Sequence, residues 1–160
     1  LSSPDQNVYI MNRFKLIIYL YNDPLLSIIS HYRRGWHIMQ HKKIVIKEEL
    51  CIEKISTFSK FQTSTLRENK DIFGLESHFY KWANLASDKS SNILFCDFRD
   101  IDVVIKLIKE KLNIEINYSL KTRSPKTNEY FDLVHPSVKD IYNRLDTKLK
   151  REIIKINSIS

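Results

Sequence analysis

The sequence predicts an α/β fold in which helices flank a parallel sheet. Residues 14–21 (FKLIIYLY) and 92–98 (NILFCDF) are short apolar runs rich in aromatic and β-branched side chains. Such runs are typical of strands buried on both faces, as the strands of parallel sheets are. Each run leads directly into a segment whose apolar residues recur at helical spacing. Strands that alternate with helices in this way indicate βα units.

Length and composition describe one globular domain. The chain has 160 residues, of which 42% are hydrophobic and 28% are charged, and this length is enough to bury a core. Two strands are too few for a complete doubly wound domain, so either further strands escape recognition or part of the sheet lies outside this chain. The chain contains only 2 glycines, which excludes a Walker A loop and a dinucleotide-binding fingerprint because both need closely spaced glycines.

The basic character of the chain favours anionic partners. The net charge is +7 and the isoelectric point is about 9.3. This excess suits nucleotides, sulfated or phosphorylated molecules, nucleic acid or a membrane surface, without choosing among them. Cys51 and Cys96 form no CxxC pair, so we expect two buried thiols, with a disulfide as the alternative. No signal peptide or membrane-spanning run is visible, so cytoplasmic is the default location, and the sequence does not fix the compartment of the full-length protein.

The first apolar run ends at a clear helix-start signal. Asp23 is a natural N-cap and Pro24 a natural first helical residue. We expect a helix from Pro24 to about Gly35 that packs back on the sheet. Its apolar stripe comprises Leu25, Ile28, Ile29, Tyr32 and Trp36.

The remaining segments are expected to be mainly helical. Residues 37–46 are ambiguous between helix, linker and strand, and residues 62–70 and 117–135 are polar and predicted to be mostly loop. We expect helices from Lys47, from Asp71, directly after the second strand, and from about Pro136. Their inward-facing residues are, in order, Cys51, Ile52, Ile55 and Phe58; Leu75, Phe79, Trp82 and Ala86; Ile101, Val104, Ile105, Ile108 and Leu112; and Val138, Ile141, Leu145 and Leu149.

The junction after the first strand is a candidate phosphate site. A helix N-terminus offers free N–H groups and the positive end of a dipole, and ligands of open α/β sheets bind at the carboxyl ends of strands. Ser27 and Ser30 could donate hydroxyl groups, and Arg33 or Arg34 could add charge. The alternative is an ordinary helix start with solvated serines and surface arginines.

This junction resembles a known segment of one enzyme family. Residues 16–36 (LIIYLYNDPLLSIISHYRRGW) are similar to the 3′-phosphate-binding segment of sulfotransferases that use the sulfate donor PAPS. That segment is a hydrophobic strand, then Arg-Asp-Pro or Arg-Asn-Pro, then a helix with a serine six residues after the proline. Pro24 and Ser30 match this spacing, whereas Asn22 stands where the family usually has arginine. The resemblance implies that Asn22 and Ser30 contact the 3′-phosphate of the donor.

Two further stretches resemble the same family in the same order. Residues 71–82 (DIFGLESHFYKW) are similar to an aromatic-rich helix that ends in tryptophan, and residues 92–101 (NILFCDFRDI) are similar to a strand that ends in Tyr-Glu-Asp-Leu. The resemblance implies that Phe98 lies near the donor's adenine, and the alternative is a core phenylalanine. The basic loop with Lys121 and Arg123 resembles the late loop that closes over the 3′-phosphate, and the alternative there is a solvated loop.

The resemblance implies an architecture and an activity. It predicts that residues 1–160 form a single sulfotransferase-like domain, with a partial P-loop-like parallel sheet flanked by helices, that lacks the N-terminal half with the donor loop. The family transfers a sulfuryl group from PAPS to a hydroxyl or amine acceptor. Its donor loop, of the Pro-Lys-x-Gly-Thr type, is not found before residue 14, so we expect no turnover by this chain alone. No catalytic residue is assigned and the acceptor is unknown.

Two other functions compete with this one. The first is a basic module that binds polyanions or nucleic acid, although the basic residues are spread along the chain and form no known nucleic-acid motif, so we do not expect nucleic acid as the partner. The second is an inactive sulfotransferase relative kept for interactions. His37 and His41 are spaced like metal ligands on a helix, but no third ligand accompanies them, and we expect no metal.

Overall fold

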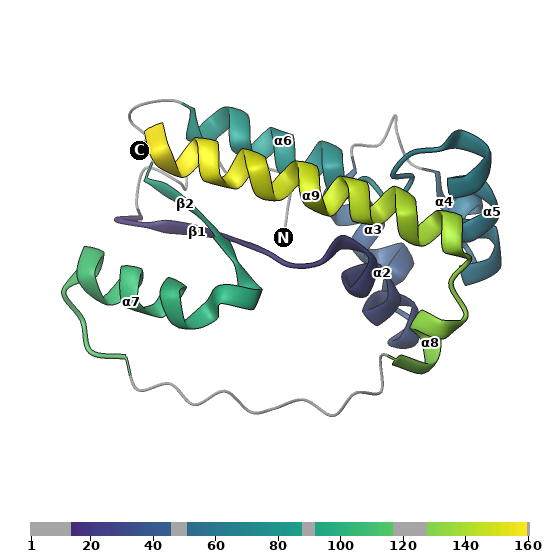
Figure 1. Ribbon diagram of the computed structural model, residues 1–160, viewed down its shortest axis with the longest axis horizontal. Helices are drawn as coiled ribbons and strands as arrows, with labels where there is room; N and C mark the ends of the chain where they lie inside the picture. Colours follow the sequence, from purple (N-terminus) through teal and green to yellow (C-terminus); the bar gives the residue numbers. More distant parts are fainter. Residues whose placement is uncertain (1–13, 46–50, 88–91, 117–127, 160) are drawn as a thin grey trace.

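The computed structural model describes residues 14–45, 51–87, 92–116 and 128–159, and shows a mostly helical chain around a small parallel sheet (Figure 1). This arrangement confirms the mixed α/β class. The elements are β1 (Ile17–Tyr21), α2 (Pro24–Arg33), α3 (His37–Ile44), α4 (Ile52–Ile55), α5 (Phe58–Glu68), α6 (Leu75–Ala86), β2 (Ile93–Asp97), the 3₁₀ turn η3 (Phe98–Asp100), α7 (Ile101–Leu112), α8 (Asn128–Asp132) and α9 (Pro136–Ile159).

The two predicted strands pair with each other in parallel, as expected. Their register runs from Ile17 opposite Ile93 to Tyr21 opposite Asp97. Both strands therefore end at the same edge of the sheet, and each is followed by a helical segment.

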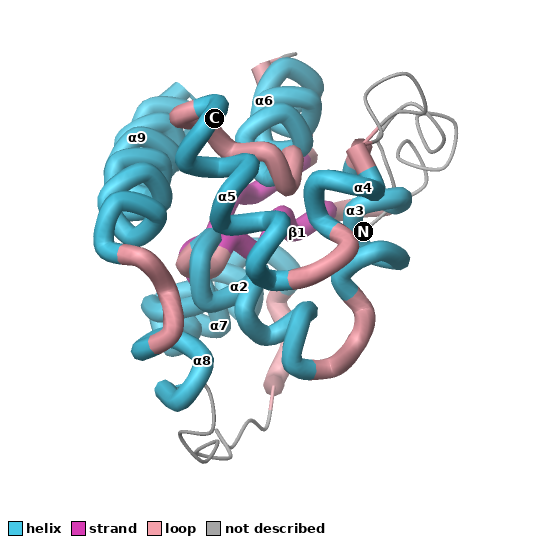
Figure 2. Tube along the Cα trace, turned by 90° about the vertical axis from the view of Figure 1, so that its right-hand side faces the viewer, coloured by secondary structure: helices cyan, strands magenta, loops and turns pink. Residues whose placement is uncertain are grey.

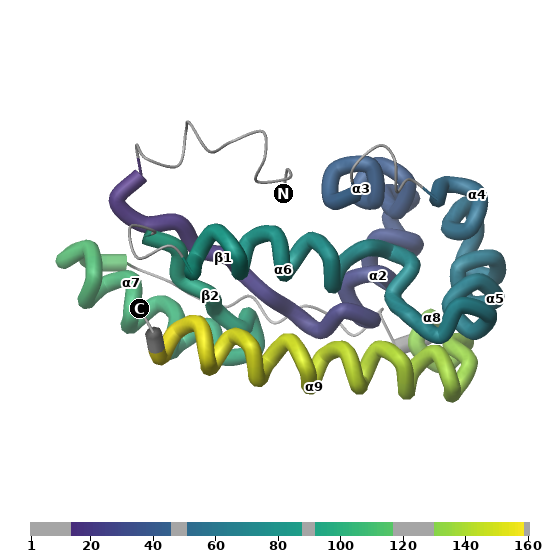
Figure 3. Tube along the Cα trace, turned by 90° about the horizontal axis from the view of Figure 1, so that it is seen from above, coloured from purple at the N-terminus to yellow at the C-terminus, as the bar shows by residue number. Residues whose placement is uncertain are grey.

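The sheet lies between two helical layers (Figure 1). Helices α6 and α9 run side by side over one face (Figure 3), and α7 lies against the other. Side chains alternate between the faces of a strand, so Tyr19 and Phe95 join the large core under α6 and α9, whereas Leu94 and Cys96 join a small core with Val104 of α7. Cys96 is buried, Cys51 is half-buried, and both are free thiols.

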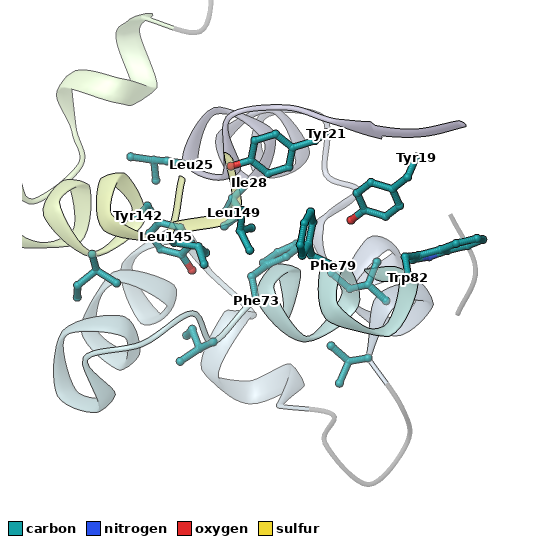
Figure 4. Close-up of a cluster of buried hydrophobic side chains, with 14 of the residues drawn as sticks. Tyr19, Tyr21, Leu25, Ile28, Phe73, Phe79, Trp82, Tyr142, Leu145 and Leu149 are labelled. Carbon is teal, nitrogen blue, oxygen red and sulfur yellow. The ribbon is translucent and has the colours of Figure 1, made fainter. Parts of the chain in front are cut away.

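Helix α9 contacts both the sheet and a group of shorter helices. Helices α2, α5 and α8 gather beyond the carboxyl end of β1 (Figure 2). The inward residues predicted for the last helix are all buried, as is Tyr142 on the same helix. Figure 4 shows Tyr142, Leu145 and Leu149 in the core. Near the other end of α9, the Asn157 side chain donates to the carbonyl oxygen of Phe95 in β2 at 2.8 Å. One long helix thus contacts both parts of the fold.

Several expected boundaries are wrong. Residues 62–68, predicted to be loop, belong to α5, because Ser64 and Thr65 are buried there beside Phe61 and tertiary packing overrides their weak helix propensity. The helix expected from Lys47 is broken: residues 46–50 lie outside the described part, α4 is only four residues long, and Thr57 caps a new helix by accepting the Lys60 N–H. Residues 128–132, within the second predicted loop, form α8.

Two further expectations need correction at helix ends. Asp71 does not begin a helix, because α6 begins at Leu75. The Asp71 carboxylate instead accepts hydrogen bonds from the backbone N–H groups of Phe73, Gly74 and Glu76 around the start of this helix. Trp36 is exposed rather than inward, because α2 ends at Arg33 and the chain turns at Gly35, which has φ +69°.

Candidate functional site

The carboxyl edge of the sheet brings two predicted site residues together. Asn22 directly follows Tyr21 and Phe98 directly follows Asp97, and these two strand residues are register partners. Adjacent strands lie about 4.8 Å apart, so residues separated by 76 positions in the sequence emerge from neighbouring strand ends. Both side chains are exposed. Phe98 is therefore not a core residue, and its ring is accessible to a ligand.

The N-terminus of α2 already holds a carboxylate. The Leu26 N–H donates to Asp23 Oδ1 at 2.9 Å, and the Asp23 N–H donates to Asn22 Oδ1 at 2.8 Å. The Ser27 hydroxyl donates to the Asp23 carbonyl oxygen at 2.8 Å. Because Asp23 supplies a negative charge at this helix end, a phosphate is better accommodated beside the helix, near the Asn22 amide NH₂, than on the helix axis.

The other residues predicted on α2 lie progressively farther from this edge. Ser30 is six residues after Pro24, about 9 Å along the helix axis, and it is half-buried. Arg33 is in the last turn and Arg34 is the C-cap residue, so both lie about 14 Å from the N-terminus. The Arg34 guanidinium is 5.3 Å from the centre of the Trp36 ring. The structure therefore separates the two arginines from Asn22.

A charged cluster that the sequence did not predict stands at the same edge. Arg99 donates to Asp97 at 2.6 Å and to Asp146 of α9 at 3.0 Å, and the Tyr21 hydroxyl donates to Asp146 at 2.5 Å. Burial raises the pKa of Asp146, but hydrogen bonds from Arg99 and Tyr21 outweigh it and hold this pKa below its usual range. Burial and the Asp146 carboxylate raise the pKa of Tyr21. No local signal links Arg99 to Asp146, since 47 residues separate them.

A partly enclosed cavity of about 210 Å³ lies between β1, α2, α3, α6 and α9, and Asn22 is one of its lining residues. Its walls are mainly apolar. Among the described residues it is lined by Tyr19, Leu20, Tyr21, Asn22, Pro24, Ser27, His31, Gln40, Ile44, Phe73, Leu75, His78, Phe79 and Leu149. Figure 4 shows four of these residues, Tyr19, Tyr21, Phe73 and Phe79, near one another in the core.

Two histidines are among the polar residues that line the cavity. His78 is bonded at both ring nitrogens: Nδ1 lies 3.1 Å from the Tyr19 hydroxyl, and Nε2 accepts the Trp82 indole N–H at 3.3 Å. Burial lowers the pKa of His78 to about 4. His31 is different, because its Nδ1 is buried without a hydrogen-bond partner in the described structure. Burial, followed by the Arg34 charge, lowers the pKa of His31 as well.

A basic surface on α9 bears on the alternative of polyanion binding. Asn143, Arg144, Thr147, Lys148, Arg151, Glu152 and Lys155 line a shallow groove there. Lys148 pairs with Glu76 and Lys155 pairs with Glu152, both at 2.6 Å. These carboxylates offset two of the four positive charges, so the groove offers a polyanion little net charge.

Other candidates resolve differently. Lys121 and Arg123 lie outside the described residues, so their expected role stays a prediction. His41 is buried and its ring links two other segments of the chain. Its Nδ1 lies 2.9 Å from the Phe73 carbonyl oxygen, and its Nε2 accepts the Cys51 N–H at 3.2 Å. Over the described ranges, no cluster of three or more His, Cys, Asp or Glu side chains is arranged to hold a metal ion, and no helix is long and apolar enough to cross a membrane.

Comparisons with known proteins identify no family for this chain. No protein-family model matches the chain, no curated protein matches it, and no solved structure matches its fold. The geometry of the site and the motif resemblance therefore carry the functional argument.

Proposed function

We propose that this chain supplies part of the donor site of a PAPS-dependent sulfotransferase, which transfers a sulfuryl group to a hydroxyl or amine acceptor. The observation that carries the proposal is the position of Asn22 and Phe98. Each was predicted from a different stretch of the sequence, and the two residues follow neighbouring strand ends at the carboxyl edge of a parallel sheet. This edge is where ligands of open α/β sheets bind. The finer fold proposed with it is a P-loop-like parallel sheet flanked by helices.

Each residue of the edge has a distinct role in this proposal. The adenine stacks on the exposed Phe98 ring, since an aromatic side chain accepts a base on its face. The 3′-phosphate lies beside α2 and receives hydrogen bonds from the Asn22 amide and the Ser30 hydroxyl. Lys121 and Arg123, which the resemblance adds to the phosphate site, lie outside the described residues and stay a prediction. Arg33 and Arg34 lie at the far end of α2, so in this proposal they contribute less to phosphate binding than the sequence predicted.

The chemistry proposed is in-line transfer of the sulfuryl group. Catalysis then rests on positioning donor and acceptor and on stabilising negative charge on the transferred group and the leaving phosphate. The residues of this chain bind and orient the nucleotide half of the donor. We assign no catalytic residue to it, and we expect the purified 160-residue chain to show no sulfuryl transfer from PAPS.

Calorimetric titration with adenosine 3′,5′-bisphosphate tests the proposal. We expect weak binding, and weaker binding still of adenosine 5′-monophosphate, which lacks the 3′-phosphate. Asn22→Arg restores a charge-assisted hydrogen bond worth about 1.5–3 kcal/mol, so affinity should rise by roughly 10- to 100-fold. Ser30→Ala should lower affinity by about fivefold, the equivalent of one hydrogen bond.

Matched aromatic variants locate the adenine. Phe98→Ala should weaken binding, because stacking on an aromatic ring contributes about 1–3 kcal/mol. Phe14→Ala is the control, since Phe14 is also an exposed phenylalanine but precedes β1 at the opposite edge of the sheet. The proposal is wrong if neither the wild-type chain nor Asn22→Arg binds the bisphosphate, or if both alanine variants behave alike.

A further inference from the structure

We propose that the end of α2 and the outer face of α3 form a surface that binds membranes containing anionic lipids. We call it the α2–α3 surface, and it combines two large apolar side chains with four basic ones. These exposed residues are Trp36, Met39, Arg33, Arg34, Lys42 and Lys43. The inference does not rest on nucleotide binding, because the edge of the sheet lies at the other end of α2.

Helical register places the two apolar side chains together. The Trp36 carbonyl oxygen accepts the Gln40 N–H at 2.9 Å, so Trp36 lies in register with α3. Residues three and seven positions apart share a helix face, which puts Trp36, Met39 and Lys43 on one side, while His41 on the same helix is buried. Trp36 and Met39 are 46% and 45% exposed, and they form an apolar pair on the surface.

The basic residues around this pair are not offset by carboxylates. Arg33 and Arg34 come before the pair, and Lys42 and Lys43 follow it by about one helical turn. Residues 24–45 contain no Asp or Glu, and no ion pair joins any of the four basic residues to a described carboxylate. The groove on α9 differs, since two of its four positive charges are paired. The α2–α3 surface is therefore suited to attract an anionic lipid surface.

The apolar pair favours a lipid surface over a nucleic acid. Tryptophan is enriched where a bilayer meets water, because its ring is apolar and its N–H can stay hydrated. Met39 is flexible and can enter the same layer, whereas it offers no ring on which a base could stack. The Arg34 guanidinium lies over the Trp36 ring, 5.3 Å from its centre, and so occupies one of the two faces that a base would need.

The position of the surface allows a membrane to reach it. Figures 2 and 3 show α3 on the side of the molecule away from α9. Stable attachment of a protein to a bilayer takes two signals, such as apolar insertion and a basic patch. The α2–α3 surface supplies both within residues 33–43.

Vesicle binding by the full 160-residue chain tests the proposal. The chain should sediment with vesicles of phosphatidylcholine mixed with phosphatidylserine, should not sediment with phosphatidylcholine alone, and should be released by salt. Tryptophan emission should shift to shorter wavelength on binding. This shift reports on Trp36, because Trp82 is only 7% exposed and lies in the core.

Two matched pairs of substitutions separate a local surface from the net charge of the chain. Lys42→Gln with Lys43→Gln should weaken binding to the mixed vesicles by about 25-fold, since each basic residue near an anionic surface contributes about fivefold. Lys106→Gln with Lys111→Gln is the control: both lysines are exposed on α7, have no ion pair with a described residue, and remove the same charge. The control should change binding by less than about twofold, because α7 lies far from α3 (Figure 1).

Trp36→Ala tests the apolar part of the surface. It should weaken binding to the mixed vesicles severalfold and abolish the emission shift, while the exposed position leaves stability nearly unchanged. A duplex DNA oligonucleotide is the competing probe, and it should bind more weakly than the mixed vesicles. Absence of binding to the mixed vesicles, equal losses in the two lysine pairs, or tighter binding of DNA that depends on Trp36 would each overturn the proposal.

Discussion

The two faces of the β1–β2 sheet are buried to very different extents. On one face, Tyr19 and Phe95 stack at 4.8 Å between ring centres, under α6 and α9. On the other face, α7 is the covering helix among the described elements, and Val104 is the one residue of α7 that is fully buried. Leu20 is 41% exposed on this second face, and Val103 on α7 is 59% exposed.

This difference shows that an apolar strand sequence predicts that the strand is buried, but not which helix covers it. The residues of β1 on both faces look equally suited to a core in the sequence. The first face is buried because α6 and α9, which begin 54 and 115 residues after the end of β1, lie over it. The helix that follows β2 has a clean apolar stripe but reaches fewer partners.

The largest predicted effect lies on the well-covered face. Phe79 is fully buried and contacts the rings of Tyr19 and Phe95 edge-on, at 5.8 and 5.3 Å between centres. Phe79→Ala should lower the free energy of unfolding by about 3–5 kcal/mol, because it removes this contact area and leaves a cavity. Urea unfolding would measure the change. The exposed Phe14→Ala should stay within about 0.5 kcal/mol of wild type, and equal losses in the two variants would contradict the contrast.

The second prediction concerns pH, and it depends on the same covered face. The pKa of His78 falls from 6.5 to about 4 on folding, so the unfolded chain binds more protons between these values. The contribution of His78 to the free energy of unfolding is therefore complete above pH 6.5. This contribution, about 3 kcal/mol, is lost as the pH falls towards 4.

The variant His78→Gln isolates this contribution. Glutamine can donate to Tyr19 and accept from Trp82 but does not titrate in this range. Urea unfolding between pH 7 and pH 4 should show a shallower loss of stability for His78→Gln than for wild type. Some slope should remain, since the pKa of His31 is also lowered. Identical slopes would show that His78 is not buried in its neutral form.

The smallest predicted effect lies on the sparsely covered face. Val104 is buried and its neighbour Val103 is exposed on the same helix. Val104→Ala should cost about 1.5 kcal/mol, the value of the apolar groups removed from the core. Val103→Ala should change the free energy of unfolding by less than about 0.5 kcal/mol. A Val104→Ala loss as large as that of Phe79→Ala would mean that both faces are covered equally.

The candidate site was predictable where its residues follow strands directly. Asn22 and Phe98 could be named from motifs, and their adjacency follows once the two strands are parallel and in register. The Arg99–Asp146–Tyr21 cluster could not be named, because it joins a turn, a strand and a helix that are far apart in the sequence. The same holds for the cavity, whose walls come from β1, α2, α3, α6 and α9.

The sequence by itself determined the local elements of this protein. The apolar runs, the Asp23–Pro24 helix start and the inward stripe of α9 are all confirmed, because strand and helix periodicity and capping act over a few neighbouring residues. The tertiary structure decided what those local rules cannot reach. Burial of Ser64 and Thr65 against partners elsewhere in the chain makes residues 62–68 helical, and the arrangement of distant helices gives one face of the sheet its core and its cavity. Hydrophobic burial depends on which surfaces meet in space, and that is a property of the whole chain.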